Sequence, residues 1–193
     1  MQKQFCLSTR DTIIQIADDL IRDKGYNAFS FYDISKAIGI KTASIHYHFP
    51  TKTDLSIALI KEHHSRLEKL KKYVADKSPF EKMEGFLSIY VRIQEEKKVC
   101  LVGSLATDLH TVDERTKQEL QSFAGEILEW VTQILEEGKS KSVFDFPIPA
   151  RTKALMIISN MLAIVQLSRL TSAADFILVK ENILRELKPN TNA

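Results

Sequence analysis

Hydrophobic residues recur along the chain with the period of an amphipathic α-helix. In the first such segment, apolar residues are spaced i, i+3, i+4, i+7 and i+8, with charged residues on the opposite side; they are Ile13, Ile16, Ala17, Leu20 and Ile21. The same reading of the whole chain predicts helices over 9–24, 31–38, 42–48, 52–75, 79–97, 101–109, 113–137, 150–170 and 174–187. The pattern therefore predicts an all-α protein.

A second signal marks several of the predicted helix starts. A Ser or Thr followed three residues later by an acidic residue can satisfy the free amides of a helix N-terminus and complement the helix dipole. This motif occurs at Ser8/Asp11, Ser30/Asp33, Thr51/Asp54, Ser78/Glu81, Thr111/Glu114 and Ser172/Asp175. Near the other end of a helix, Gly138 is predicted to terminate the segment before a long loop over 139–149.

Composition narrows the class of protein. The chain has 193 residues with only 6 Gly and 5 Pro, too few turn residues for a many-stranded sandwich or barrel. Two cysteines, Cys6 and Cys100, cannot form a disulfide framework or a four-ligand zinc site. The first residues lack the apolar segment of a signal peptide, and polar residues interrupt the apolar stretch 154–170, so we expect a cytoplasmic protein without a membrane span. The net charge of +2 does not decide whether nucleic acid is a partner.

Residues 31–48 have the pattern of a helix-turn-helix. Two short predicted helices flank a turn in which Gly39 can adopt the left-handed conformation. The expected apolar side that holds the two helices together is Ile34, Ala37, Ile38, Ile40 and Ile45. The second helix would then present small and hydrogen-bonding residues to the major groove of DNA, namely Thr42, Ala43, Ser44, His46, Tyr47 and His48. The alternative is a helical hairpin with no role in nucleic-acid binding.

At these residues the sequence resembles a known family. From Thr9 to Leu59 it is similar to the DNA-binding head of TetR/AcrR-family transcriptional repressors, in its aromatic-rich second helix, Gly39-Ile40, the 46–49 block His-Tyr-His-Phe and Lys52-x-Asp-Leu. The resemblance implies base-edge or groove contacts for Tyr32, Thr42, Ala43 and His46, and phosphate contacts for Ser44, Tyr47, His48 and Lys52. Lys52 also lies in the first turn of a predicted helix, where free amides favour an anion.

Two positions depart from the family pattern. Lys41 stands where a Ser or another capping residue is usual, and His46 stands where Tyr is usual. The resemblance further implies a helix-turn-helix DNA-binding domain over residues 1–50 and a helical effector-binding and dimerisation domain over residues 51–193.

The last two predicted helices carry apolar residues on more than one face, which requires cover on two sides. A second copy of the chain can supply that cover, and the resemblance implies a two-fold four-helix interface built from 150–170 and 174–187. The alternative is a purely intramolecular core.

The middle helices hold apolar residues that could line a ligand cavity. The resemblance implies an inducer pocket there, and the candidate residues are Phe86, Tyr90, Cys100, Leu105, Phe123 and Trp130. Because Lys97 and Lys98 precede Cys100 near a predicted helix start, a lowered thiol pKa and a redox role are an alternative.

We therefore expect a ligand-responsive repressor that binds a pseudo-palindromic operator as a homodimer and is released by a small apolar effector. The alternatives are a thiol-based redox or electrophile sensor using Cys100, and a helical protein-interaction adaptor. No Gly-rich phosphate loop, nucleophile elbow or His-Glu-x-x-His motif is present, so we expect no enzyme activity and no cofactor. The adjacent His63 and His64 lack the i, i+4 spacing of a helical metal site, so we expect no metal ion.

Overall fold

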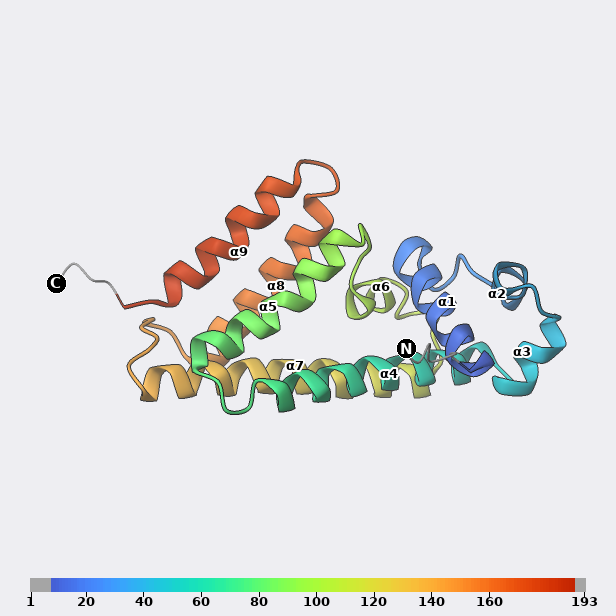
Figure 1. Cartoon of the computed structure of the whole chain (residues 1–193), viewed down its shortest axis with the longest axis horizontal. Coiled ribbons are helices and arrows are strands. Elements are labelled where there is room, and N and C mark those ends of the chain that lie inside the picture. Colours follow the sequence, from blue (N-terminus) through green and yellow to red (C-terminus); the bar gives the residue numbers. More distant parts are fainter. Residues whose placement is uncertain (1–7, 190–193) are drawn as a thin grey trace, which may run out of the picture. The chain divides into compact units, whose positions relative to one another are not determined.

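The computed structural model describes residues 8–189 (Figure 1), and over these residues the chain forms helices and no strand. The helices are α1 (Thr9–Lys24), α2 (Phe31–Ile38), α3 (Thr42–His48), α4 (Lys52–Tyr73), α5 (Pro79–Glu95), α6 (Leu101–Thr107), α7 (Glu114–Ser140), α8 (Ala150–Leu167) and α9 (Ala173–Leu187). The all-α prediction is confirmed. The largest differences from the predicted ends are at α7, which runs on to Ser140, and at α8, which ends at Leu167.

The predicted capping motifs start most of these helices. The Ser8 hydroxyl accepts from the amide of Asp11, and full capping boxes open α2, α5 and α9 at Ser30, Ser78 and Ser172. At α4 the Asp54 amide donates to the Thr51 hydroxyl at 3.1 Å. Short-range sequence therefore accounts for where these helices begin.

The motif at Thr111 is wrong as a cap. The Asp113 carboxylate accepts from the amide of Arg115 at 2.8 Å and caps α7, while the Thr111 hydroxyl contacts Asn27. Asp113, directly before the first residue of α7, takes the capping role. Thr111 is therefore left to make a long-range contact with Asn27.

Gly138 is not a helix terminus, because α7 continues through it. A Cβ atom at Gly138 would lie 1.9 Å from Cδ2 of Phe144, so the glycine makes room for this buried ring from the loop that follows. The Gly138 carbonyl also accepts from the amides of Val143 and Phe144 at 2.8 and 3.0 Å. The glycine at this position therefore serves packing against the loop rather than termination.

The chain divides into two compact units. The first comprises the chain up to His64 together with Leu101–Gln121, and the second comprises Ser65–Cys100 together with the chain from Ser122 onward. The first unit therefore includes α6 and much of α4 in addition to α1–α3. The boundary predicted at residue 50 concerns function and stays a prediction.

The core of the first unit forms where α1 contacts α2 and α6, and α2 contacts α3. The α1 side chains Ile13, Ala17 and Ile21 are fully buried, whereas Ile16 and Leu20 are half-buried. The Ser104 hydroxyl of α6 donates to the Ile21 carbonyl at 2.7 Å. This bond ties α6 to α1 within the unit.

In the second unit α8 and α9 lie side by side, and both contact α5 (Figure 1). The core positions of α8 and α9 include Ile157, Met161 and Phe176. Over the residues described, none of the helices combines the length and the apolar character needed to cross a membrane.

Candidate nucleic-acid interface

The turn between α2 and α3 has the geometry that the sequence predicts. Gly39 adopts the left-handed conformation with φ 71°, and the amides of Gly39 and Ile40 both donate to the Ser35 carbonyl. Ile34 of α2 and Ile45 of α3 are fully buried, as expected for residues that hold the two helices together. The helix-turn-helix arrangement is therefore present.

One residue of the predicted apolar side is placed differently. Ala37 is exposed, and the buried face of α2 is formed by Ile34 and Ser35. The Ser35 hydroxyl donates to the Tyr32 carbonyl at 2.8 Å, so burial of this polar group is compensated. Serine was not expected there because its polarity alone suggests an exposed position.

The predicted DNA-contacting residues lie on the surface of the helix-turn-helix. On α3, Ala43, Ser44, His46 and Tyr47 are exposed, Thr42 and His48 are half-buried, and Tyr47 is 86% exposed. On α2, Tyr32 is 66% exposed. The buried Ile45 fixes which side of α3 faces the protein, so the other residues form an outward-facing polar surface, here called the α3 face: Thr42, Ala43, Ser44, His46, Tyr47 and His48.

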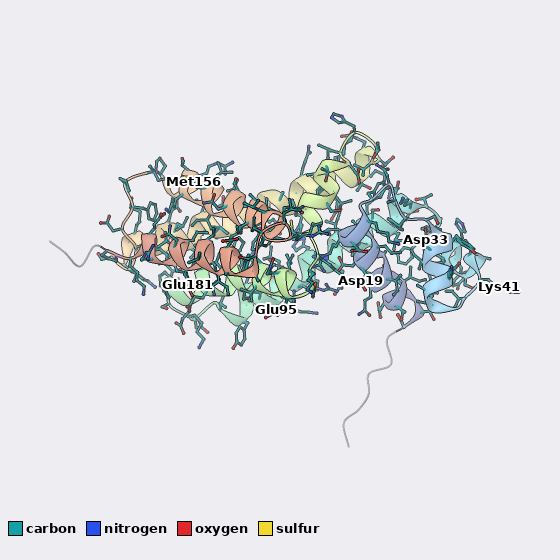
Figure 2. All side chains as sticks on the ribbon, turned by 90° about the horizontal axis from the view of Figure 1, so that it is seen from above. Asp19, Asp33, Lys41, Glu95, Met156 and Glu181 are labelled. Atoms are coloured by element: carbon teal, nitrogen blue, oxygen red, sulfur yellow. The ribbon has the colours of Figure 1, made fainter. Side chains whose placement is uncertain are left out.

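Lys41 occupies the N-cap position of α3 and makes no side-chain capping bond. The side chain is exposed and is labelled in Figure 2. The departure from the family pattern therefore places a cation, in place of a capping residue, at the start of the predicted recognition helix.

His46 is held by contacts on both sides of its ring. The Nδ1 atom lies 3.1 Å from the Pro50 carbonyl oxygen, and the ring meets the Phe31 ring edge to face with centroids 4.8 Å apart. The imidazole of the predicted base-contacting residue therefore contacts both α2 and the turn between α3 and α4.

Lys52 has a position that the sequence did not predict. Its ammonium donates to the carbonyls of Tyr26 and Phe29 at 2.6 and 2.7 Å and lies 4.4 and 4.1 Å from the centroids of their rings. Burial lowers the pKa of Lys52, and the negative charges of Asp108 and Asp33 partly oppose that shift. The predicted phosphate contact stays a prediction, and the structure adds a contact with the loop between α1 and α2.

The same loop has a second set of partners that sequence reasoning missed. The Asp108 carboxylate accepts from the Tyr26 amide at 2.8 Å and from the Asn27 side-chain amide at 3.0 Å. Asn27 also lies 2.8 Å from the Thr111 hydroxyl through its Nδ2 atom. No local pattern reveals these bonds, because their partners are 81 to 84 residues apart in the chain.

Most of the predicted effector residues lie in the second unit. Phe86 meets Tyr90 and Trp130 edge to face, with ring centroids 5.6 and 6.1 Å apart. These three residues and Phe123 are buried, and Cys100 is half-buried. Leu105 belongs to α6 in the first unit. Their role in effector binding stays a prediction.

The Tyr90 hydroxyl and the Cys100 thiol interact electrostatically. Burial raises the pKa of the Tyr90 hydroxyl, and the nearby Cys100 adds a smaller contribution in the same direction. The redox alternative rests on Cys100, and Cys6 lies outside the described residues.

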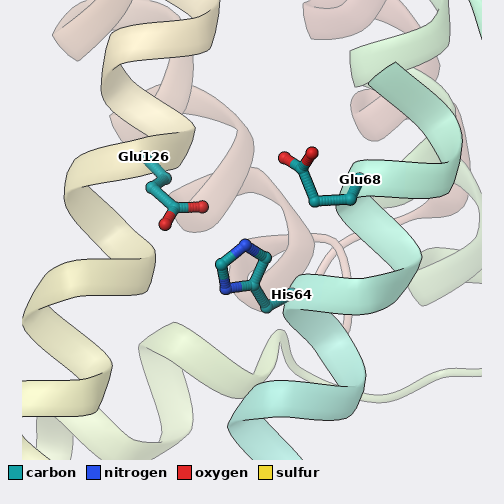
Figure 3. A group of neighbouring side chains, drawn as sticks. All are labelled: His64, Glu68 and Glu126. Carbon is teal, nitrogen blue, oxygen red and sulfur yellow. The ribbon is translucent and has the colours of Figure 1, made fainter. Parts of the chain in front are cut away.

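Figure 3 shows three side chains that offer metal-ligand atoms, His64, Glu68 and Glu126. His64 and Glu68 are one turn apart on α4, and Glu68 pairs with Lys71 at 2.6 Å. His64 closes the first unit, whereas Glu68 and Glu126 belong to the second. Because these three side chains belong to two different units, they are not described as a metal site.

Comparisons with known proteins agree with the helix-turn-helix. A sequence model of the bacterial regulatory proteins of the tetR family matches residues 13–59. Among curated proteins, the negative transcriptional regulator IcaR of the biofilm operon icaADBC from Staphylococcus epidermidis is 41% identical over 46 residues, or 24% of this chain. That match spans about a quarter of IcaR, 25% of its length.

Solved structures extend the likeness over more than nine-tenths of the chain. A TetR transcriptional regulator from Legionella pneumophila is 32% identical with a TM-score of 0.85, covering 96% of this chain and 100% of that one. A TetR-family regulator from Agrobacterium tumefaciens is 27% identical with a TM-score of 0.84, covering 93% of this chain and 97% of that one. The recognition segment and the full-length similarity point the same way, and the chain belongs to the TetR family of transcriptional regulators.

Proposed function

We propose that this regulator is a repressor that binds a pseudo-palindromic DNA operator as a homodimer and releases it when a small apolar effector binds. The observation that carries the proposal is the α3 face, which is mostly exposed and mostly polar while Ile45 on the same helix is fully buried. Small residues at its start let the backbone approach base edges, and its hydroxyl and imidazole groups can bond to phosphates and bases.

Within this proposal the residues divide by role. Tyr32, Thr42, Ala43 and His46 contact base edges or the groove, and Ser44, Tyr47 and His48 contact phosphates. Two copies of α3 related by a two-fold axis would read half-sites about 34 Å apart or more. The name of the relative IcaR, a negative regulator, supports repression rather than activation.

The dimer is supported by apolar side chains on the surface of α8 and α9. These exposed residues form what we call the aliphatic surface: Leu155, Met156, Leu167, Ile177 and Leu178, with Leu170 just after α8. Met156 is labelled in Figure 2. A groove on this surface is lined by residues of both helices, including Leu167 and Leu178. An intramolecular core accounts for the buried Ile183 but leaves the aliphatic surface in water, which favours a second copy as its cover.

The effector part of the proposal rests on the aromatic cluster of Phe86, Tyr90 and Trp130 in the second unit. An effector that prefers the non-binding state by about 1–3 kcal/mol would lower DNA affinity about 5- to 150-fold. Trp130 is the only tryptophan of the chain, so its fluorescence reports directly on ligands that bind beside it.

The experiment that tests DNA recognition is selection of duplexes from a random pool by the full chain, followed by measurement of Kd for the selected and for a scrambled duplex. We expect the selected sequences to contain two inverted half-sites. A chain that binds both duplexes equally would overturn the proposal. For the effector, apolar ligands that quench Trp130 should also release the selected duplex, whereas release by mild oxidant from wild type and not from Cys100→Ser would favour the redox alternative.

A further inference from the structure

The loop between α1 and α2, residues 25–30, is held from two sides by charged side chains. The amide of Tyr26 donates to Asp108, and the carbonyl of the same residue accepts from Lys52. Both polar groups of one backbone position are therefore bound by residues of opposite charge, one on α4 and one in the turn after α6. All of these residues belong to the first unit.

The contacts of Lys52 belong to a closed circuit of contacts that includes the predicted recognition helix α3. Lys52 binds the Phe29 carbonyl, and two residues later the Phe31 ring packs on His46. His46 in turn contacts the Pro50 carbonyl, two residues before Lys52. The circuit of contacts thus returns to Lys52. A shift of the α1–α2 loop must therefore move His46 or break one of these contacts.

The opposite side of the loop is held by acceptors matched to donors. Each oxygen of the Asp108 carboxylate faces one N–H donor, from the Tyr26 amide and from Asn27. The Thr111 hydroxyl accepts from the Asn27 side-chain amide and donates to the Asp108 carbonyl, which fixes the turn that carries the carboxylate. Gly25 adopts φ 91°, and a Cβ atom there would lie 3.4 Å from Asp108 Oδ2, so the backbone passes close to the carboxylate.

The geometry points to Asp108 and Lys52 as positioning residues for DNA binding: they clamp the α1–α2 loop, and through Phe31 they set the position of His46 on the α3 face. This inference rests on the proposed DNA-binding function. Lys52 acts here mainly through the protein backbone, since two of its three N–H donors are already bound to carbonyls.

The decisive variant is Asp108→Asn, because charge and positioning predict opposite results. Removing a negative charge should strengthen DNA binding or leave it unchanged if only the electrostatic field matters. The substitution also turns an N–H donor toward the donor of Tyr26 or Asn27, so the clamp predicts about tenfold weaker binding to the selected duplex. Asp23→Asn, at an exposed position of α1, is the charge-matched control and should not weaken binding.

A second variant, Lys52→Met, separates positioning from phosphate contact. A lost phosphate contact would weaken binding to all duplexes equally and reduce the salt slope of log K by about 0.9. The clamp instead predicts a lower ratio of selected to scrambled affinity with little change in the salt slope. Hydrogen exchange in free protein provides a readout without DNA, and both variants should lose protection at the Tyr26 amide, which donates to Asp108.

The outcomes are distinguishable. If wild type prefers the selected duplex while both variants lose loop protection and keep that preference, the clamp does not position the α3 face and the inference is overturned. The same holds if the variants keep wild-type protection. If wild type shows no preference for any duplex, the proposed function fails and the inference fails with it. Thr111→Val, which removes one hydroxyl at an exposed site, is the milder variant should Asp108→Asn fail to fold.

Discussion

The α3 face and the aliphatic surface are both exposed, yet they offer opposite chemistry. Tyr47 in the first is 86% exposed and carries a hydroxyl that bonds to water and can exchange that water for a phosphate oxygen. Leu178 in the second is 64% exposed and gains free energy only when it leaves water. The comparison teaches that each surface is suited to a different partner, a hydrated polyanion in one case and a second protein surface in the other.

The largest effect should come from placing a charge on the aliphatic surface. Leu178→Glu would bury an unpaired carboxylate in the dimer at a cost of about 3–5 kcal/mol, so the dimer should dissociate at micromolar concentration. Analytical ultracentrifugation measures this. Because Leu178 is exposed in the single chain, the monomer should keep its fold. Tyr73→Glu introduces the same charge at another exposed site, 77% exposed, and should leave the dimer intact. A wild type that is already monomeric would remove the basis of the comparison.

On the α3 face, loss of one hydroxyl should act on DNA and spare assembly. Tyr47→Phe removes a hydrogen bond to a charged phosphate, worth about 1.5–3 kcal/mol, and should weaken binding about tenfold or more. Fluorescence anisotropy with the selected duplex gives the change in Kd. Tyr73→Phe makes the identical change outside the α3 face and should bind as wild type does. Equal weakening in the two variants would contradict the assignment.

His46→Ala should change which sequence is bound more than how tightly DNA is bound. The substitution removes the contacts of the ring with Phe31 and Pro50 along with a predicted base contact. Repeating the duplex selection should yield a site altered at one position in each half-site, with a loss of about 1–3 kcal/mol confined to the original base there. An unchanged selected sequence would show that His46 does not read a base.

The smallest effects concern two helix caps of the same kind, one in each unit. Ser30→Ala removes the N-cap of α2 and Ser78→Ala removes the N-cap of α5. Each substitution should lower the free energy of unfolding by about 1 kcal/mol. Only Ser30→Ala should also weaken DNA binding, because α2 supports the α3 face. Urea unfolding and DNA titration of both variants test this difference.

Acid should remove the same capping contribution. Bonds from the Ser30 hydroxyl and amide lower the pKa of Asp33, and bonds from the Ser78 amide and hydroxyl lower the pKa of Glu81. A carboxyl whose pKa is lower in the folded state stabilises the fold at pH values above its unfolded-state pKa of about 4. This stability is lost as the pH falls through the folded-state pKa. Wild type should therefore lose more stability between about pH 5 and pH 2 than either Ser→Ala variant.

The helices and the recognition turn could be predicted because their determinants are local. A cap such as Ser30 with Asp33, or a turn glycine such as Gly39, lies within three or four residues of the bonds it makes. Gly138 failed as a predicted helix end because its reason is the ring of Phe144, which packs on the helix from the following loop. The contacts of Asp108 with the α1–α2 loop could not be predicted at all, since no pattern in the sequence connects Asp108 to Tyr26.

The first unit is discontinuous in the chain, which limits how such regulators can exchange parts. The chain leaves the unit after His64 and returns to it at Leu101–Gln121, and the returning segment supplies the Ser104 hydroxyl to α1. A single crossover near residue 60 would combine one parent's α1 with the other parent's α6, and the Ile21 carbonyl would keep its partner only if both parents carry a donor at that place. Chimeric regulators that transplant DNA specificity should therefore work best as a graft of two segments, with residues 101–121 moving together with the N-terminal one.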